Sequence, residues 1–473
     1  MPINTYDRAF IDGQWIRNTG AESIQVVNPS TEQTIGIIQG ASETEVDQAC
    51  AGASHALSRW AAHPLAERAE YVERIALALE AQGEHLAHLI TDEVGTPICD
   101  SREFQVAAAV RSFRRAGELG RGLPLEETLG STTVVRVPVG VIGCITPWNY
   151  PLFQIASKVA AALVAGCTVV VKPSEVAPGS ALALAEITRA VGLPAGVFNL
   201  VLGSGSVVGE RMLNSPHIDA VSFTGSTRAG QRIAQVAGAG LKRVSLELGG
   251  KSPSIVLPDA DIDVAVERTI AKCLQNSGQT CAAWTKLIVP LRALDTVIET
   301  AVRSFRSYRL GDPREETTRL GPVTTAGQRA RVRELLDSAT QEGAELLIGG
   351  PDAPENLPCG YFVKPSLYLA NSRMTIAREE IFGPVLTLLV YSSENEALQL
   401  AEAGDYGLSS AVWSRDPQRA EAFGRRLRAG SVSINGASTH PDAPFGGFRR
   451  SGFGRERGRY GIEEFLTTSA VHH

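Results

Sequence analysis

The feature that most constrains the fold is the alternation of short β-branched segments with Ala-rich helical segments between residues 139 and 248. The connections between these segments are short, which predicts an α/β fold with a mostly parallel open sheet and helices on both faces. We expect strands at Val139–Ile145, Thr168–Val171, Val197–Val201, Ala220–Phe223 and Arg243–Leu248. We expect helices at Pro151–Val164 and Ser180–Val191, after Gly205, and from Ser226.

A second alternating region, between residues 252 and 435, predicts a second α/β domain. Its strands are expected at Ser254–Leu257, Lys286–Val289, Val385–Val390 and Ser431–Ile434. Its helices are expected near 261–274, 291–307, 326–342, 394–403 and 416–428. Ahead of the first sheet, residues 1–40 favour short strands and residues 43–118 favour two or three helices. We expect the tail from residue 455 to pair with the strand region around Pro138.

Charge and cysteine content exclude several function classes. The 473 residues carry 45 Lys and Arg against 51 Asp and Glu, and a net charge of −6 does not favour a nucleic-acid partner. The apolar segment Val159–Val171 lies between Lys158 and Lys172 and falls short of the about 20 residues that a membrane span needs. The first residues lack the features of a secretion signal, and the seven cysteines form no CxxC pair. We therefore expect a cytoplasmic protein without a membrane partner or a metal site.

Two glycine-rich turns and one polar loop are candidate ligand sites. The segment 203–209 (GSGSVVG) departs from the GxGxxG fingerprint at Val208, and such a turn can also serve simple packing. The segment 223–226 (FTGS) begins a helix, whose N-terminal N–H groups attract anions. The loop 172–175 (KPSE) follows a buried strand at the edge where open α/β sheets bind ligands. Glu175 could accept hydrogen bonds from both hydroxyls of a ribose; the alternative is a surface ion pair within the loop.

Four further segments carry groups suited to catalysis. LELGGK places Glu247 before a Gly-Gly turn, and NSGQTC ends in Cys281 in a loop between a helix and a strand. PWNYP holds Asn149 at the end of the first sheet strand, and EEIFGP places Glu380 and Phe382 before a buried strand. Taken singly, the acid could be an ordinary strand residue and the cysteine an inert buried thiol.

Together with VKPSE, FTGST and PFGGFRRSGFGRE, these motifs give the chain a resemblance to one family over essentially its whole length. The chain resembles the aldehyde dehydrogenase superfamily. The resemblance implies two Rossmann-like open-sheet α/β domains and a small β oligomerisation arm, in a homodimer or homotetramer. The implied cofactor domain is 1–118 with 139–248, the catalytic domain 249–450, and the arm 119–138 with 451–473.

The resemblance also implies NAD-dependent oxidation of an aldehyde to a carboxylic acid. Cys281 would attack the aldehyde as a thiolate, because a hydride leaves a carbon readily only when an oxyanion on that carbon pushes it. The Asn149 amide and the Cys281 backbone N–H would stabilise the oxyanion of the thiohemiacetal. After hydride transfer, Glu247 would act as the general base for hydrolysis of the thioester.

A larger set of residues would bind the cofactor by the same resemblance. Lys172 and Glu175 would contact the adenosine ribose, Trp148 and Ser226 would lie near the pyrophosphate, and Glu380 would contact the nicotinamide ribose. The full expected set is Ile145, Thr146, Pro147, Trp148, Lys172, Ser174, Glu175, Gly205, Gly209, Phe223, Thr224, Gly225, Ser226, Leu248, Glu380 and Phe382. The carboxylate of Glu175 repels a 2′-phosphate, which favours NAD and leaves NADP as a secondary cofactor.

Three other functions compete with this hypothesis. A CoA-acylating relative would pass the acyl group to CoA, but that subgroup lacks the glutamate found here at Glu247. A non-catalytic binding protein could use the same fold, and a cysteine hydrolase could use a Cys281–His440 dyad. A calcium loop at 259–263 fails because Val264 stands where a glycine is required, so we interpret the segment as a helix cap.

The family pattern also places the substrate entrance. Its expected lining is Tyr150, Gln154, Ser157, Thr280, Ala282 and the loop 437–441. Gln154 and Ser157 are polar and of modest size, which favours an open tunnel for polar, aromatic or larger aldehydes. No arginine pair demands a carboxylated substrate, although an arginine on a loop could serve.

Overall fold

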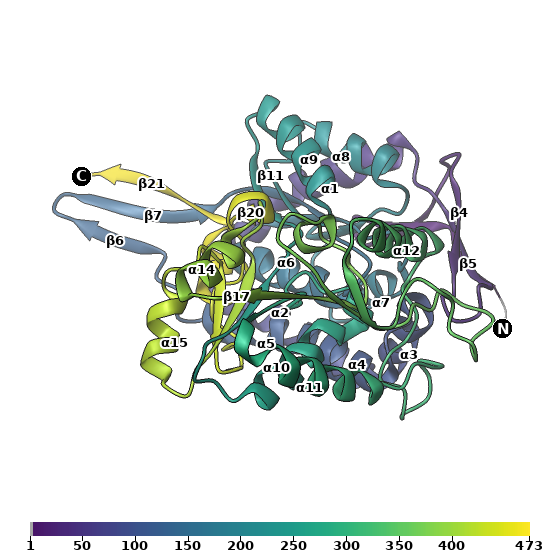
Figure 1. The fold of residues 1–473 in the computed structure, drawn as a ribbon. Coiled ribbons are helices and arrows are strands. Elements are labelled where there is room, and N and C mark those ends of the chain that lie inside the picture. The colour runs from purple at the N-terminus through teal and green to yellow at the C-terminus, as the bar shows by residue number, and fades with distance from the viewer. Residues whose placement is uncertain (1–2) are drawn as a thin grey trace.

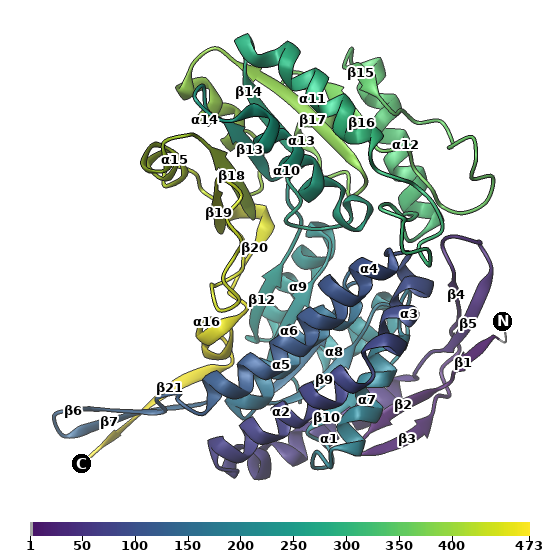
Figure 2. The ribbon, with the colours of Figure 1, turned by 90° about the horizontal axis from the view of Figure 1, so that it is seen from below.

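An eight-stranded sheet forms the centre of the larger of two lobes (Figures 1 and 2), in a computed structural model that describes residues 3–473. The strands lie in the order β20 (Gly452–Phe453), β12 (Arg243–Glu247), β11 (Ala220–Thr224), β8 (Val141–Ile145), β9 (Thr168–Lys172), β10 (Phe198–Leu200), β2 (Arg8–Ile11) and β3 (Gln14–Arg17). From β12 to β10 neighbouring strands run parallel, and all five strands predicted for this sheet are confirmed. The outer strands β20, β2 and β3 pair antiparallel.

Helices cover both faces of this sheet (Figure 1). One face carries α1 (Glu43–Ala62), α8 (Glu210–Asn214) and α9 (Thr227–Ala239). The other carries α6 (Pro151–Ala165) and α7 (Gly179–Ala190), with α2 (Leu65–Ala81), α3 (Gly83–Val94) and α5 (Ala107–Gly120) packed outside them. Because α6 lies between the sheet and α5, nearly every residue of α6 is buried. This explains the apolar segment that begins near Lys158.

One helix prediction in this lobe was wrong in number. Residues 43–120 form four helical segments instead of two or three, because α4 (Ile98–Asp100) and the π-helical η1 (Ser101–Val106) run on into α5. The helix predicted after Gly205 is confirmed, since η2 (Gly205–Gly209) runs directly into α8.

The smaller lobe is built on a seven-stranded sheet, parallel except at its β15 edge. Its order is β15 (Glu345–Ile348), β16 (Ser366–Leu369), β17 (Val385–Tyr391), β14 (Lys286–Pro290), β13 (Pro253–Val256), β18 (Ser409–Trp413) and β19 (Ser431–Ile434). The helices of this lobe are α10 (Ile262–Leu274), η4 (Leu291–Ala293), α11 (Leu294–Arg306), α12 (Ala326–Gln341), α13 (Thr375–Arg378), α14 (Glu394–Glu402) and α15 (Pro417–Gly424). The side chain of Asp261 accepts a hydrogen bond from the N–H of Val264, which confirms the predicted helix cap.

Sequence patterns missed β15, β16, β18 and α13, and they extended the helix at 416–428 beyond its end at Gly424. β18 escaped because its sequence, SSAVW, opens with two serines although every residue is buried. The structure satisfies one of them through the Ser410 Oγ, which donates to the backbone carbonyl of Ser431. Burial of a polar strand thus depends on a neighbour that single-sequence patterns do not show.

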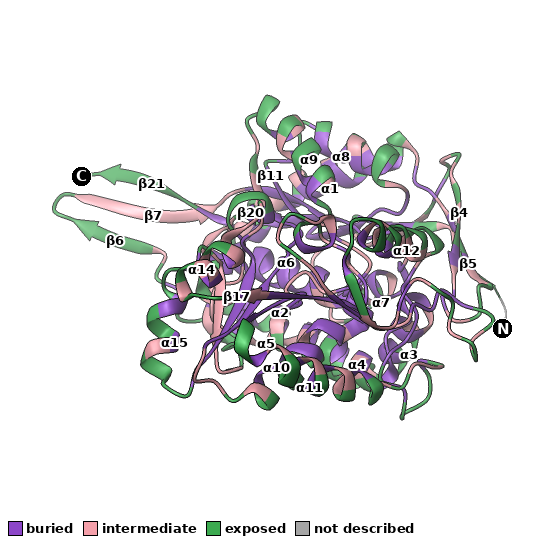
Figure 3. Ribbon diagram, in the orientation of Figure 1, coloured by how far each residue is buried: buried purple, intermediate pink, exposed green. Residues whose placement is uncertain are grey.

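A three-stranded β-arm projects from the larger lobe (Figures 1 and 2). Its strands are β21 (Leu466–His472), β7 (Thr132–Pro138) and β6 (Glu126–Leu129), and the pairing of β21 from Leu466 opposite Pro138 confirms the prediction for the tail. Figure 3 shows the arm as mostly exposed or intermediate, in contrast to the buried central strands. The short helix α16 (Gly458–Glu463) precedes β21, and β1 (Asn4–Tyr6), β5 (Thr34–Gln39) and β4 (Ser23–Val27) form a separate small sheet. Among residues 3–473, no helix combines the length and apolarity that crossing a bilayer requires.

Candidate active site

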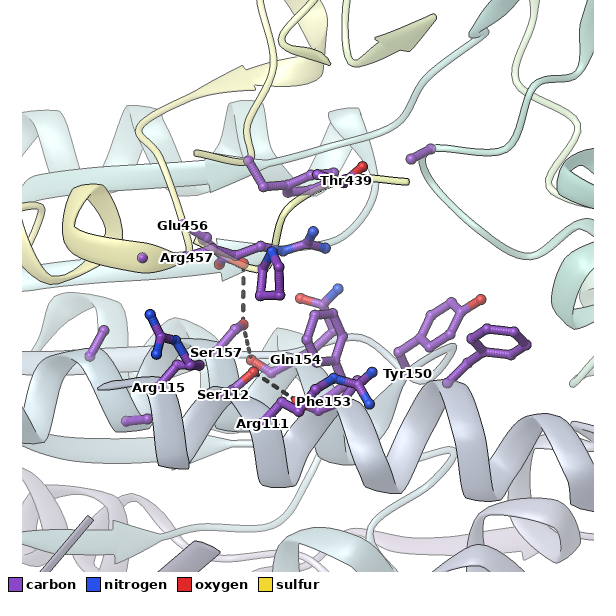
Figure 4. Close-up of a pocket in the computed structure, with 18 of the residues that line it drawn as sticks. Arg111, Ser112, Arg115, Tyr150, Phe153, Gln154, Ser157, Thr439, Glu456 and Arg457 are labelled. Atoms are coloured by element: carbon purple, nitrogen blue, oxygen red, sulfur yellow. Dashed lines mark hydrogen bonds between the residues drawn. The ribbon is translucent and has the colours of Figure 1, made fainter. Parts of the chain in front are cut away.

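Two cavities meet at Cys281 between the lobes. The large cavity, about 660 Å³, lies between the carboxyl ends of β8, β11 and β12 and the loop 379–382 of the smaller lobe. The small cavity, about 290 Å³, lies between α5, α6 and the C-terminal segment 439–458 (Figure 4). Cys281 lines both, and no other described residue does. A group bound in either cavity would therefore face the same sulfur atom.

The loop before Cys281 has an unusual backbone. Within η3 (Gln275–Gly278), Asn276, Ser277 and Gly278 all have positive φ, at 53°, 55° and 76°. For the two that are not glycine, Asn276 and Ser277, this conformation costs about 1–3 kcal/mol each, and it persists only where the surroundings enforce it. Here Asn276 Nδ2 donates to the carbonyl of Asn149 at 3.0 Å, and Ser277 Oγ donates to the carbonyl of Gly321 at 2.8 Å. Contacts from both lobes therefore hold the loop that presents Cys281.

Donors for an oxyanion are available beside the sulfur. Asn149 is 3% exposed and lines the large cavity with Cys281. One Nδ2 hydrogen is engaged by the carbonyl of Gln279 at 2.8 Å, and the amide has a second. Among residues 3–473, none accepts a hydrogen bond from the backbone N–H of Cys281. Both donors predicted from the sequence therefore remain able to bind a new oxygen anion.

Glu247 is a buried carboxyl group that faces the large cavity. Its side chain is 3% exposed, and neither Oε1 nor Oε2 has a hydrogen-bond partner among the described residues. Burial raises the pKa of Glu247 well above its usual range, and the nearby Glu456 carboxyl raises it further. Unpaired buried carboxyl groups are costly and are typical of general acid–base sites.

The thiol of Cys281 is protonated at neutral pH in this environment. Burial, followed by the negative charges of Glu247 and Glu380, raises its pKa to about 12. Arg457 and Lys272 act in the opposite direction without reversing the shift. Loss of the thiol proton therefore calls for a base, and Glu247 lines the large cavity together with Cys281.

Lys158 and Glu456 form a buried ion pair near Glu247, and sequence analysis did not predict this pair. Lys158 on α6 is 1% exposed, and its Nζ donates to Glu456 and, at 2.7 Å, to the hydroxyl of Thr224. Ser157 Oγ donates to the second oxygen of Glu456 at 3.2 Å. Glu456 belongs to the recognised GFGRE motif, but nothing local in that motif indicates a lysine from α6 as its partner.

The two lobes meet across the large cavity through two aromatic rings. Trp148 and Phe382 pack edge to face, with centroids 5.6 Å apart. Phe382 has a φ of 56°, and the Gln328 Nε2 holds its turn by donating to the carbonyls of Ile381 and Phe382. The rings form a wall suited to a flat heterocycle.

Glu380 forms a hydrogen bond with the Gly-Gly turn that follows β12. Its Oε1 accepts a hydrogen bond from the N–H of Gly250 at 3.0 Å, and burial raises its pKa to about 7. A Cβ on Gly249 would lie 2.0 Å from Glu380 Oε2, so a side chain there would displace the carboxylate from this position. Sequence analysis did not identify seven charged or polar residues that also line the cavity: Thr227, Arg228, Gln328, Arg331, Glu379, Tyr406 and Arg450.

Eight of the predicted cofactor residues line the large cavity: Pro147, Trp148, Thr224, Gly225, Ser226, Leu248, Glu380 and Phe382. Ser226 caps α9, with its side chain accepting from the N–H of Ala229, so the positive end of that helix faces the cavity. The others do not line this cavity: Ile145, Thr146, Lys172, Ser174, Glu175 and Phe223 lie on β8, β9 and β11 or in the loops after β8 and β9, and Gly205 and Gly209 lie in η2, which follows β10. Since these parallel strands are neighbours, the set lies along the same edge of the sheet as the cavity.

Local contacts distinguish the outer candidates. Lys172 Nζ pairs with Glu175 Oε2 at 2.9 Å, and Ser174 Oγ accepts from the N–H of Val176. The turn before Gly205 already binds a carboxylate, because Ser204 donates to Glu22 through both its N–H and its hydroxyl. Of the two candidate phosphate turns, this leaves the N-terminus of α9 as the better site. A Cβ on Gly205 would meet no atom within 4 Å, so internal packing does not require glycine there.

The small cavity has the lining expected for a substrate entrance. Tyr150, Gln154, Ser157, Thr280, Ala282, Thr439 and Pro441 all line it (Figure 4). Charged groups missed from the sequence also line it: Arg111, Arg115, Lys272, Glu456 and Arg457. His440 lines neither cavity, and its ring is largely exposed, so a Cys281–His440 dyad finds no support.

Comparisons with known proteins agree in family. The model of the aldehyde dehydrogenase family matches residues 15–471. The chain is 45% identical over 471 residues to 3-succinoylsemialdehyde-pyridine dehydrogenase of a Pseudomonas species, covering 99% of each. It superposes with a TM-score of 0.97 and 43% identity on a cysteine-to-alanine mutant of aldehyde dehydrogenase C from Pseudomonas syringae, complexed with NAD+ and octanal, covering 98% and 96% of the two chains. The NAD+ complex of a Bacillus cereus aldehyde dehydrogenase gives a TM-score of 0.95 at 34% identity, covering 98% and 96%.

Proposed function

The chain belongs to the aldehyde dehydrogenase family and oxidises aldehydes with NAD, and on that premise we propose that Cys281, Asn149 and Glu247 carry the reaction. The observation that carries this proposal is the convergence of two cavities on one sulfur atom. The small cavity admits the aldehyde, and the large cavity holds the cofactor.

The large cavity suits the nicotinamide and pyrophosphate end of a dinucleotide in size and chemistry. Its volume of about 660 Å³ lies within the ordinary range for ligand pockets. Ser226 at the positive end of α9 suits the pyrophosphate, and Glu380 suits the ribose near the reacting ring. Lys172 and Glu175 are proposed to hold the adenosine ribose, with NAD preferred and NADP accepted less well. When bound, the cofactor accepts the hydride that leaves the substrate carbon.

The first half of the reaction forms and uses a bond to sulfur. Glu247 accepts the proton of Cys281, and the thiolate attacks the aldehyde carbon to form a thiohemiacetal. Asn149 and the Cys281 N–H stabilise the resulting oxyanion. As the carbonyl reforms, the hydride leaves, and an acyl group remains on Cys281 as a thioester.

The second half returns the free enzyme. Glu247 first passes the proton taken from Cys281 to solvent, and it then accepts a proton from a water molecule, whose oxygen attacks the thioester carbon. The carbon–sulfur bond breaks, the carboxylic acid leaves, and the Cys281 thiolate takes back a proton from Glu247. The buried, unpaired state of Glu247 supports this role, and its presence argues against transfer of the acyl group to CoA.

We also propose the assembly, location and domain division that the resemblance implied. Exposed apolar side chains on the β-arm, Leu129 and Val471, support a homodimer or homotetramer joined through the arm. Seven free cysteines support a cytoplasmic location. The two sheets support a cofactor domain of 1–118 with 139–248 and a catalytic domain of 249–450, with 119–138 and 451–473 contributing to the arm.

The test is NADH formation from a panel of aldehydes by the wild-type protein and by two variants. Cys281→Ala should lower turnover by at least about 10³-fold while NAD binding, followed by calorimetry, is retained. Cys359→Ala removes an exposed cysteine far from the site and should behave as wild type. Normal turnover by Cys281→Ala would exclude Cys281 as the nucleophile.

A further inference from the structure

An arginine in the small cavity has no partner that explains its position. Arg457 lines the cavity opposite α5 and α6 (Figure 4), and its backbone has φ 73° and ψ 154°. This region of backbone conformation is one that residues other than glycine rarely adopt. The fold keeps Arg457 in this unfavourable backbone conformation, which indicates that the position of its side chain has a function.

The guanidinium of Arg457 is held by aromatic faces. It lies 4.4 Å from the ring centroid of Phe445 and 5.5 Å from that of Phe153. No residue from 3 to 473 accepts a hydrogen bond from it or forms an ion pair with it within 4 Å. The neighbouring Arg455, by contrast, donates to the carbonyls of Gly447 and Gly454. The five N–H donors of Arg457 thus remain free beside the cavity.

The charge of the cavity is uncompensated. Glu456 is the single carboxylate in the described lining, and it is already paired with Lys158. Arg115 is neutralised by Asp442 at the rim. Arg457 and Arg111 then remain without a carboxylate partner among residues 3–473, and Lys272 has only the amide oxygen of Gln275. The cavity is therefore electropositive around a site that a substrate must enter.

We propose that Arg457 binds a carboxylate at the far end of the aldehyde substrate, so that the preferred substrates are ω-oxo acids. This inference rests on the proposed function, which places the aldehyde carbon at Cys281. A planar guanidinium fixed by two rings is preorganised for a bidentate carboxylate, and Arg111 and Lys272 add to the attraction. Arg457 and Cys281 line the same cavity of about 290 Å³, so a short substrate can reach both groups.

The experiment compares an ω-oxo acid of four or five carbons with the uncharged aldehyde of the same length. The wild-type protein should favour the ω-oxo acid in kcat/KM. Arg457→Gln should lower kcat/KM for the ω-oxo acid by about 10- to 100-fold, mainly through KM, and change the uncharged aldehyde by less than about 3-fold. Arg457→Lys should recover part of the preference. Arg459→Gln, on the exposed side of α16, is the matched control and should change neither substrate.

Two outcomes would overturn the proposal. One is a wild-type protein whose kcat/KM shows no preference for the charged substrate. The other is an equal loss of kcat/KM for both substrates in Arg457→Gln, which would indicate that Arg457 acts on the Cys281 thiolate instead of on a substrate carboxylate. A wild-type protein that reduces NAD with neither aldehyde would instead count against the proposed function.

A second measurement needs no variant. A dicarboxylate of matching length should inhibit the wild-type protein more strongly than the monocarboxylate. Equal inhibition by the two acids contradicts a carboxylate site.

Discussion

At the scale of single residues, the proposed chemistry depends on groups whose polar atoms have no partner among the described residues. Glu247 has two buried oxygens without partners, Asn149 has a buried unpaired side-chain oxygen, and Cys281 is held as a neutral thiol. Burying such groups without partners lowers the stability of the fold, and packing of the surrounding core offsets this loss. The arrangement leaves the carboxyl group of Glu247 free to accept a proton, first from sulfur and then from water.

Replacing Glu247 by Gln should separate the two halves of the reaction. The side chain keeps its shape but loses its basicity, so steady turnover should fall by about 10² to 10⁴-fold. If hydrolysis becomes limiting, stopped-flow absorbance should show one NADH formed per site before the slow phase. Glu186→Gln, on the exposed face of α7, is the control and should leave both phases unchanged. An unimpaired steady rate in Glu247→Gln would rule out this residue as the base.

The pH dependence of turnover should report the same group. Because burial and Glu456 raise the pKa of Glu247, its carboxylate becomes protonated at a higher pH than an ordinary glutamate. A protonated Glu247 cannot accept a proton, so wild-type turnover should fall as the pH decreases through this raised pKa. In Glu247→Gln this acid limb should disappear from the kcat profile.

Glu175 should determine the choice between NAD and NADP. Its carboxylate, paired with Lys172 at 2.9 Å, would repel a 2′-phosphate at the proposed ribose position. Glu175→Gln should narrow the NAD-over-NADP ratio of kcat/KM by about 10-fold, which corresponds to about 1.4 kcal/mol. Lys172→Met should weaken both cofactors and leave the ratio nearer to wild type. A ratio unchanged in Glu175→Gln would place the 2′ position elsewhere.

Sequence reasoning located residues that belong to contiguous motifs and missed those that depend on distant partners. Asn149, Glu247 and Cys281 each stand in a recognisable segment, and the fold brings them to one cavity. Lys158 was interpreted only as the end of an apolar segment, because its partner Glu456 lies 298 residues away in the chain. Arg457 escaped for a similar reason, since Phe153, one of the two rings that contact it, comes from α6 in a distant part of the chain.

At the scale of elements, the loop η3 links backbone strain to the position of the nucleophile. Gly278 has φ 76°, and a Cβ there would lie 1.9 Å from the carbonyl oxygen of Gly383. The Asn-Ser-Gly sequence suits left-handed residues, but only the structure shows that Gly383 of the neighbouring turn closes on it. Parallel strands and long helices were predictable from periodicity. The buried strand β18 and this loop were not, because tertiary contacts define them.

Replacing Gly278 by Ala should therefore disturb both stability and activity. We expect a loss of more than about 2 kcal/mol in the free energy of unfolding, since the strain of positive φ is joined by a clash with backbone. Gly192→Ala is a matched control: its φ is 73°, but a Cβ there would meet no atom within 4 Å. It should cost only about 1 kcal/mol. Chemical denaturation gives both values, and equal losses would show that the contact with Gly383 is unimportant.

At the scale of the whole molecule, the β-arm leaves a strand largely exposed, which fits the proposed assembly through the arm. β21 pairs with β7 along its full length from Leu466 to His472, yet most of its side chains are exposed. A long exposed strand edge is ordinarily avoided in a monomer. The arm is therefore expected to be covered in the assembled protein.

Removing residues 466–473 should reduce the mass of the assembly. Without β21 the arm keeps only β6 and β7, a two-stranded hairpin of marginal stability. Light scattering after size exclusion should show smaller particles, and Val471→Asp should produce the same change by charging one exposed apolar position. Circular dichroism should confirm that the α/β lobes persist. An assembly with an unchanged number of subunits would show that the arm is not an interface.

Placing one sulfur atom at the junction of two separate cavities has a kinetic consequence. Since the aldehyde and the dinucleotide would each reach Cys281 through a separate cavity, a molecule bound in one cavity leaves the other accessible. An inhibitor shaped like the aldehyde would then act as a noncompetitive inhibitor toward the dinucleotide, and the acid product could depart while the reduced dinucleotide stays bound.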